Sequence, residues 1–136
     1  MRLKISSFII LLILSIFLPL QTQAETKTIH LYFFHAQGCL TCAQEEAFLN
    51  TLLQQDASLK LFSYELAFDQ ENQDFSHKIS ELLPNPINST PTLVIGQKVI
   101  VGFVEGTTDI EILESIEFAQ NNAIKDVIGE VLGIAD

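Results

Sequence analysis

The sequence predicts a single α/β domain whose elements follow one another in the order β-α-β-α-β-β-α. Segments rich in aromatic and β-branched residues alternate with segments whose apolar residues recur at helical spacing, which favours helices packed on a sheet. The last two strand segments are separated by a Gly-Gln pair, which is typical of a hairpin turn. Setting aside a 24-residue leader leaves 112 of the 136 residues, enough for one domain.

The first half of the domain is predicted to form two β-α units. Residues 28–35 are nearly continuously apolar, as in a central strand that is covered on both faces, and a short turn leads from them into a helix at 41–54. Residues 59–66 alternate in polarity and form the second predicted strand. A second helix is predicted at 70–83. The Pro-Asn-Pro sequence at 84–86 forbids its continuation. The apolar residues on one face of this helix are Phe75, Ile79, Leu82 and Leu83.

The second half is predicted to form the hairpin and a third helix. The hairpin strands are expected at 92–95 and 98–103. Thr108 and Glu111 have the spacing of a capping box, so the third helix is expected to begin there and to end near Gln120. The residues expected to face inward are Ile112, Leu113 and Ile116.

The last segment, residues 123–136, is predicted to be an extra amphipathic helix. Its apolar residues lie at helical spacing, although Gly129 and Gly133 interrupt the pattern. Two roles stay open for this tail: it covers the core of its own domain, or it docks on a partner. We therefore divide the chain into a leader at 1–24, a domain at 25–122 and a tail at 123–136.

Two cysteines, Cys39 and Cys42, are the only ones in the chain, and they lie where the first strand gives way to the first helix. A bridge between residues this close in sequence closes too short a loop to stabilise a fold, so a redox-active pair is favoured. A metal-binding pair and an inert structural pair are the alternatives. Cys39 lies at a helix N-terminus, which stabilises a thiolate, whereas Cys42 falls on the inward side of the helix. We expect Cys39 to be the nucleophile and Cys42 to resolve the mixed disulfide.

The charges near the cysteines are mostly negative. No Lys or Arg occurs between Lys27 and Lys60, whereas Glu45 and Glu46 lie in the first turns of the helix and oppose a thiolate. We therefore predict only a moderately lowered pKa for Cys39.

One histidine lies close to the cysteines in the sequence. His35 ends the first strand, so it could modulate the Cys39 thiolate as a cation or a proton shuttle, or simply pack against the loop. A metallochaperone is the second function class to consider, since two thiolates and the His35 imidazole are copper or zinc ligands. Its weakness is that the chain has no second cysteine pair.

The N-terminal 24 residues have the layout of a secretory signal peptide. Arg2 and Lys4 precede an apolar stretch at 8–18, and small residues precede residue 25. We expect export, to the periplasm or outside the cell, with an uncleaved membrane anchor as the alternative. The remaining chain has five lysines against 17 acidic residues, a net charge of −12. Such a surface disfavours nucleic acid and anionic membranes as partners.

The element order, the C-x-x-C sequence after the first strand and the Thr90-Pro91 step before the hairpin together resemble the thioredoxin-like superfamily in its short glutaredoxin-like form. The resemblance covers residues 27–121. More specifically, YFFHAQGCLTC, PTLVIG and VIVGF are similar to small exported domains that accompany membrane thiol transporters of the cytochrome c biogenesis type.

The resemblance implies a mixed four-stranded sheet flanked by helices. It also implies a thiol-disulfide oxidoreductase that exchanges electrons with protein thiols and disulfides, without an organic cofactor or a metal. Pro91 is then expected to be cis and to shape a substrate groove together with Thr90. A non-catalytic interaction module for a membrane partner is the remaining alternative.

Two departures from the superfamily pattern concern the dithiol. Thioredoxins have a buried carboxylate six residues before the first cysteine and a tryptophan immediately before it. These positions are Phe33 and Gly38 here, so the usual internal proton acceptor is missing. The residues between the cysteines, Leu40-Thr41, also differ from the Gly-Pro of thioredoxins and the Pro-His of strong exported oxidants. The resemblance therefore does not imply a direction of electron flow.

Overall fold

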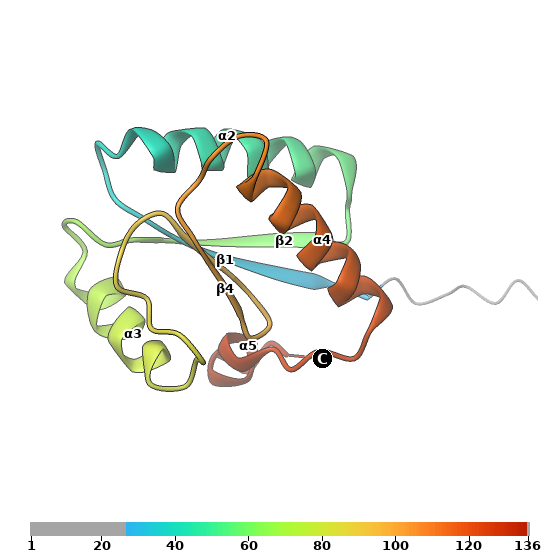
Figure 1. Ribbon diagram of the computed structural model, residues 1–136. Coiled ribbons are helices and arrows are strands. Elements are labelled where there is room, and N and C mark those ends of the chain that lie inside the picture. Colours follow the sequence, from blue (N-terminus) through green and yellow to red (C-terminus); the bar gives the residue numbers. More distant parts are fainter. Residues whose placement is uncertain (1–26, 136) are drawn as a thin grey trace, which may run out of the picture.

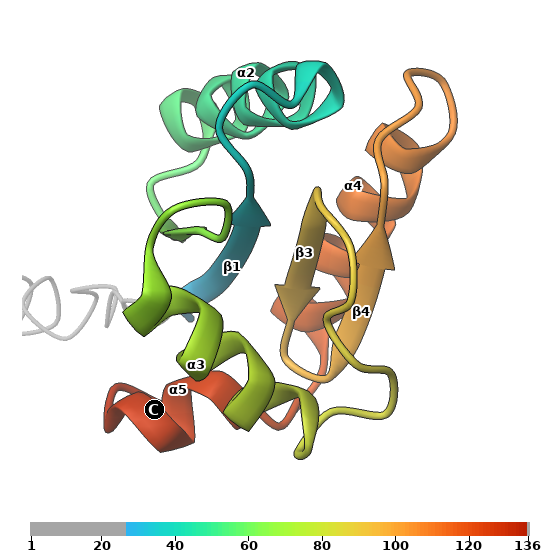
Figure 2. The same ribbon diagram turned by 90° about the vertical axis from the view of Figure 1, so that its left-hand side faces the viewer.

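The computed structural model describes residues 27–135, and its four strands form one mixed sheet. The strands are β1 (Ile29–His35), β2 (Leu59–Glu65), β3 (Thr92–Ile95) and β4 (Lys98–Val101), in the spatial order β2-β1-β3-β4. β1 runs parallel to β2. β3 is antiparallel to both of its neighbours, β1 and β4 (Figure 2). This topology confirms the predicted α/β class.

Four helices cover the two faces of the sheet. α2 (Leu40–Gln55) and α4 (Thr108–Asn121) lie on one face, and α3 (Gln70–Ser80) and α5 (Val127–Leu132) lie on the other (Figure 1). Each face has its own cluster of buried apolar side chains. The domain therefore has three layers, with the sheet in the middle.

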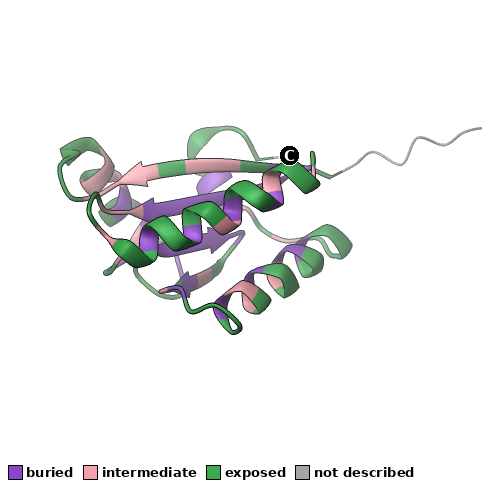
Figure 3. Ribbon diagram, turned by 90° about the horizontal axis from the view of Figure 1, so that it is seen from above, coloured by how far each residue is buried: buried purple, intermediate pink, exposed green. Residues whose placement is uncertain are grey.

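The central strand β1 separates the two clusters. Leu31 and Phe33 face α2 and α4, whereas Tyr32 and Phe34 face α3 and α5, and all four side chains are fully buried. The buried strands lie in the middle of the fold, between helices that are largely exposed (Figure 3). Alternate side chains of a strand point to opposite faces, so a strand covered on both sides must be apolar throughout. This burial explains the nearly continuous apolar run of the first strand.

The second predicted helix was too long. α3 ends at Ser80, and Leu82 is half exposed rather than inward. A residue before proline is disfavoured in the helical region, and Leu83 precedes Pro84, so the chain leaves the helix ahead of that step.

The third helix begins at Thr108, as predicted, but the predicted capping box does not form. Thr107 is the N-cap of α4, and no side chain caps it. The Thr108 hydroxyl instead accepts a hydrogen bond from the Val104 N–H, at 3.0 Å, which secures the preceding loop. Leu113 is 47% exposed because α4 packs through the narrow stripe of Ile112, Ile116 and Ala119.

The tail of the chain packs on its own domain. Val127 and Ile128 of α5 are buried in the same cluster as Tyr32, and Gly133 ends the helix in the left-handed conformation. The predicted signal peptide and the alternative membrane anchor lie outside the described residues, and the domain boundaries remain a prediction. Within residues 27–135, no helix has both the length and the apolar character needed to span a membrane.

Candidate active site

The two cysteines form a disulfide at the N-terminus of α2. Gly38, in the left-handed region with φ of 79°, turns the chain into the helix. Cys39 is the N-cap residue, and its Sγ accepts a hydrogen bond from the Cys42 N–H at 3.1 Å. An N-cap side chain lies among unpaired backbone N–H groups, which would also stabilise a thiolate at this sulfur.

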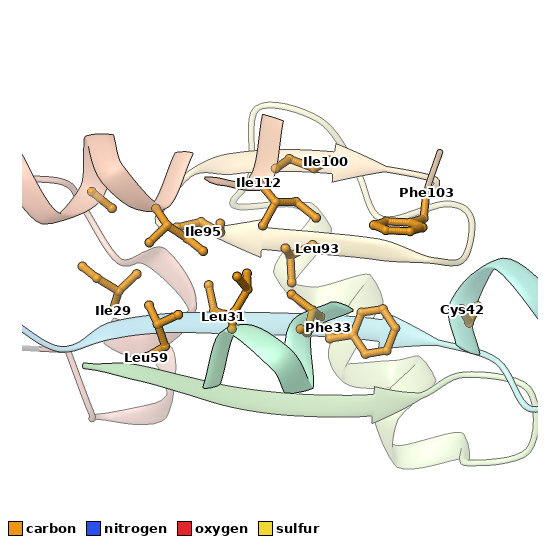
Figure 4. Close-up of a cluster of buried hydrophobic side chains, with 14 residues drawn as sticks. Ile29, Leu31, Phe33, Cys42, Leu59, Leu93, Ile95, Ile100, Phe103 and Ile112 are labelled. Carbon is orange, nitrogen blue, oxygen red and sulfur yellow. The ribbon is translucent and has the colours of Figure 1, made fainter. Parts of the chain in front are cut away.

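The two cysteines differ in exposure, as predicted. Cys42 is 3% exposed and belongs to the core cluster beyond Phe33 (Figure 4), whereas Cys39 is half-buried at the surface. A bulky substrate can therefore reach the sulfur of Cys39 more readily than that of Cys42.

A hollow beside the dithiol brings together residues from three segments. Its lining includes both cysteines together with His35, Glu65 and Phe68. His35, at the end of β1, is half-buried and stacks on Phe33 with ring centroids 5.2 Å apart. The structure thus places the predicted modulator His35 at the same hollow as Cys39, and it also packs against its own strand.

Glu65 ties the loop before Cys39 to the loop after β2. Its carboxylate accepts hydrogen bonds from the backbone N–H groups of Phe68, Gln37, Ala67 and Asp69, at 2.8, 3.0, 2.7 and 3.2 Å. These bonds, that of Phe68 first, lower the pKa of Glu65 to about 2. They hold the side chain of Phe68, 78% exposed, at the edge of the hollow, and sequence reasoning missed this arrangement.

Thr90 and Pro91 lie at the same edge of the sheet as the cysteines. The Thr90-Pro91 peptide bond is cis, as the resemblance implied. The last β1–β3 pair is Phe34 with Thr92, so Pro91 enters β3 where β1 ends and the cysteine loop begins. Thr90 lines a second hollow, next to Ala36, rather than the hollow that contains the two sulfurs.

Glu45 is the residue that sequence reasoning placed wrongly. It was expected to oppose the thiolate as an acid, but its side chain is fully buried and neither carboxyl oxygen has a hydrogen-bond partner. Burial raises the pKa of Glu45 to about 8, so the group is largely uncharged at neutral pH. The available signal was spacing, because Glu45 falls on the inward stripe of α2 with Cys42, Leu49 and Leu52.

The metallochaperone alternative concerns Cys39, Cys42 and His35 as metal ligands. Among residues 27–135, no group of three or more His, Cys, Asp or Glu side chains is arranged so that it could hold a metal ion.

The fold is similar to that of a solved thioredoxin and of a second solved protein. Thioredoxin f2 of Chlamydomonas reinhardtii matches with a TM-score of 0.55 and 13% identity, over 74% of this chain and 86% of that chain. A protein of Agrobacterium tumefaciens matches with a TM-score of 0.54 and 17% identity, over 71% of this chain and 47% of that one. No protein-family model and no curated protein matches the sequence. These likenesses show the fold, which is thioredoxin-like.

Proposed function

We propose that this thioredoxin-like chain is a thiol-disulfide oxidoreductase that exchanges electrons with protein thiols and disulfides. The observation that carries the proposal is the asymmetric pair, in which a half-buried Cys39 caps α2 and is bonded to a buried Cys42. The accessible sulfur can meet a substrate, and the buried one can attack only its neighbour.

The two sulfurs divide the reaction into two steps. In the reduced protein, the Cys39 thiolate attacks a substrate disulfide, and one substrate sulfur leaves as a thiolate. Cys42 then attacks the Cys39 sulfur of the mixed disulfide, which forms the Cys39–Cys42 bond and releases the second substrate thiolate. The same steps in reverse oxidise a substrate dithiol. The pair itself holds two electrons, so the reaction needs no organic cofactor.

The surroundings of the dithiol suit a protein substrate. Two large apolar side chains near the dithiol, Leu40 and Phe68, are 75% and 78% exposed. We infer that they contact apolar residues beside a substrate cysteine, while Thr90 and Pro91 contact the substrate chain from the start of β3. His35 is proposed to modulate the Cys39 thiolate from the end of β1.

The proposed setting is outside the cytoplasm, with residues 1–24 as the export signal. In that compartment, disulfides form and persist, so a C-x-x-C pair meets substrate thiols that are able to cycle. A membrane thiol-electron transporter is the proposed redox partner, in keeping with the resemblance of the dithiol and hairpin sequences to exported domains of that kind.

Trapping of a mixed disulfide tests the proposed function. Cys42→Ser should accumulate a covalent complex with a disulfide-containing protein, because Cys39 can attack but nothing resolves the product. The matched variant Cys39→Ser should trap far less, since the remaining sulfur is buried. Failure of Cys42→Ser to form a complex that a reducing agent dissolves would contradict the proposal.

A further inference from the structure

The buried carboxyl group of Glu45 has no place in the two exchange steps described above. We propose that Glu45 is the proton-exchange partner of Cys42: it takes the Cys42 thiol proton during resolution of the mixed disulfide and returns it when the disulfide is reduced. This inference rests on the proposed oxidoreductase function.

Placement on α2 is the first observation. Glu45 follows Cys42 by three residues, and side chains at that helical spacing are neighbours, with Cβ atoms about 5–6 Å apart. Both side chains are on the buried side of the helix, at 0% and 3% exposure. At this spacing, a glutamate side chain has the length to reach toward the neighbouring position, so proton exchange with the Cys42 sulfur, directly or through one water molecule, is sterically accessible.

The unpartnered state of the carboxyl group is the second observation. Burial of a polar group without a hydrogen bond is costly, so a carboxyl group kept for structure alone would be expected to have donors around it. Glu65 and Asp126 accept several hydrogen bonds each, whereas both oxygens of Glu45 accept none. This contrast points to a chemical role for Glu45, because a structural role does not explain its lack of hydrogen-bond partners.

Other charged groups on the same side of the sheet lie at its margins. His35 and Glu65 end neighbouring strands, and Glu105 and Asp109 line a hollow beside the start of α4. Lys98 of β4 is paired with Glu111 at 2.7 Å. Within residues 27–135, none of these groups forms a hydrogen bond or ion pair with Glu45, so burial alone sets its protonation.

Protons and electrons balance in both directions. During resolution, the Cys42 S–H proton passes to Glu45, the Cys42–Cys39 bond forms, and the substrate sulfur leaves with the electron pair of the broken bond. That thiolate then takes up a proton. In reverse, a substrate thiolate attacks Cys39, the Cys39–Cys42 bond breaks, and the departing Cys42 thiolate takes the proton of Glu45.

A general acid or base works best when its pKa is near the working pH. Since burial raises the pKa of Glu45 to about 8, both protonation states are accessible near neutral pH. An exposed glutamate, with a pKa near 4.5, would be a poor acid for a thiolate.

Single-turnover resolution separates this role from the rest of the reaction. The reduced full-length protein is mixed with the aromatic disulfide of thionitrobenzoate, and the release of each coloured thiol is followed by stopped flow. The first release reports attack by Cys39, and the second reports resolution by Cys42. At pH 7, Glu45→Gln should slow the second release by about tenfold or more, with little change in the first. Glu117→Gln, an exposed acid on α4, should change neither.

The pH profile distinguishes proton exchange from a packing effect. The wild-type resolution rate should show an inflection near pH 8 that Glu45→Gln lacks and Glu45→Asp partly restores. An unchanged second release and profile in Glu45→Gln would overturn the role of Glu45 and leave the proposed function intact. Failure of the wild type to release the second thiol would instead contradict the proposed function.

Titration of the carboxyl carbon of Glu45 by NMR in the wild type covers the case in which Glu45→Gln does not fold. The expected titration lies well above the ordinary pH range of a glutamate and shifts between the disulfide and dithiol states. Titration near pH 4.5 in both states would overturn the proposal.

Discussion

The two ends of the sheet bury carboxyl groups in opposite ways. Beside α5, Asp126 Oδ2 lies 2.7 Å from His30 Nδ1 and accepts a hydrogen bond from the Tyr32 hydroxyl at 2.9 Å, while Oδ1 accepts one from the Gly129 N–H at 2.9 Å. At the dithiol end, Glu45 is more deeply buried and has no partner. Asp126 is thus a carboxylate that holds the fold together, whereas Glu45 is free to gain and lose a proton.

The hydrogen-bonded cluster of His30, Tyr32 and Asp126 at the α5 end keeps its bonds over the physiological pH range. Burial first, and then the hydrogen bond to Asp126, raise the pKa of Tyr32 above its ordinary range, so the hydroxyl remains a donor at every physiological pH. The cluster attaches α5 to β1 across more than 90 positions of the chain. We infer that this attachment, together with the burial of Val127 and Ile128, holds the tail on its own domain.

Removal of the bonded carboxylate should have the largest effect on stability. Asp126→Ala leaves the buried polar atoms of His30 and Tyr32 without their acceptor, so we expect the free energy of unfolding to fall by about 3 kcal/mol. Urea denaturation measures the change. Glu130→Ala, which removes an exposed pair with Lys125, is the control and should cost less than about 1 kcal/mol. Equal losses in the two variants would contradict the structural role of the cluster.

Replacement of Glu45, the unpartnered carboxyl group, should instead increase the free energy of unfolding at high pH. Because the pKa of Glu45 is raised from 4.5 to about 8, the folded state holds a proton that the unfolded state has released between these pH values. The contribution of this proton to the free energy of unfolding is complete below pH 4.5. It is lost, by roughly 1 kcal/mol per pH unit, as the pH rises to about 8.

Glu45→Leu has no such slope, so at pH 8 it should be more stable than the wild type by about 2 kcal/mol. Urea denaturation between pH 5 and pH 9 measures both quantities. Parallel stability curves for the two proteins would show that Glu45 does not titrate in the predicted range.

Added volume at Gly129 tests how closely the α5 cluster is packed. A Cβ at this position would lie 2.9 Å from the Tyr32 hydroxyl oxygen and closer still to the Asp126 carboxylate. We expect Gly129→Ala to cost about 1–2 kcal/mol, and to cost less when Asp126→Ala is already present. Additive losses in the double variant would show that the two residues are not coupled.

The smallest predicted effect concerns Glu65, an acid at the dithiol end that does have partners. Glu65→Gln weakens acceptance from four backbone N–H groups, so the amides of Gln37 and Phe68 should exchange hydrogen faster. Turnover of a protein disulfide should fall a few-fold, while that of a small disulfide should change little. An equal change with both substrates would show that Glu65 does not act through the position of Phe68.

The sequence predicted those parts of the fold that depend on the spacing of apolar residues along the chain. β1 was recognisable because burial on both faces demands continuous apolarity, and the exposure of the cysteines followed from the helical position of Cys42. The bond between His30 and Asp126 could not be predicted, because nothing local relates residues 96 positions apart. The sequence prediction for Glu45 was wrong because its position on the inward stripe of α2 buries the carboxyl group, despite its polarity.

The reduction potential of the purified protein tests the central claim, that Cys39 and Cys42 are an exchange-active pair, most directly. The protein is equilibrated with graded thiol buffers, and the alkylated cysteines are counted at each potential. We predict a reversible two-electron transition between about −120 and −270 mV, the range of exchange catalysts. A pair that stays oxidised below about −300 mV would behave as a structural bridge and would contradict the oxidoreductase function.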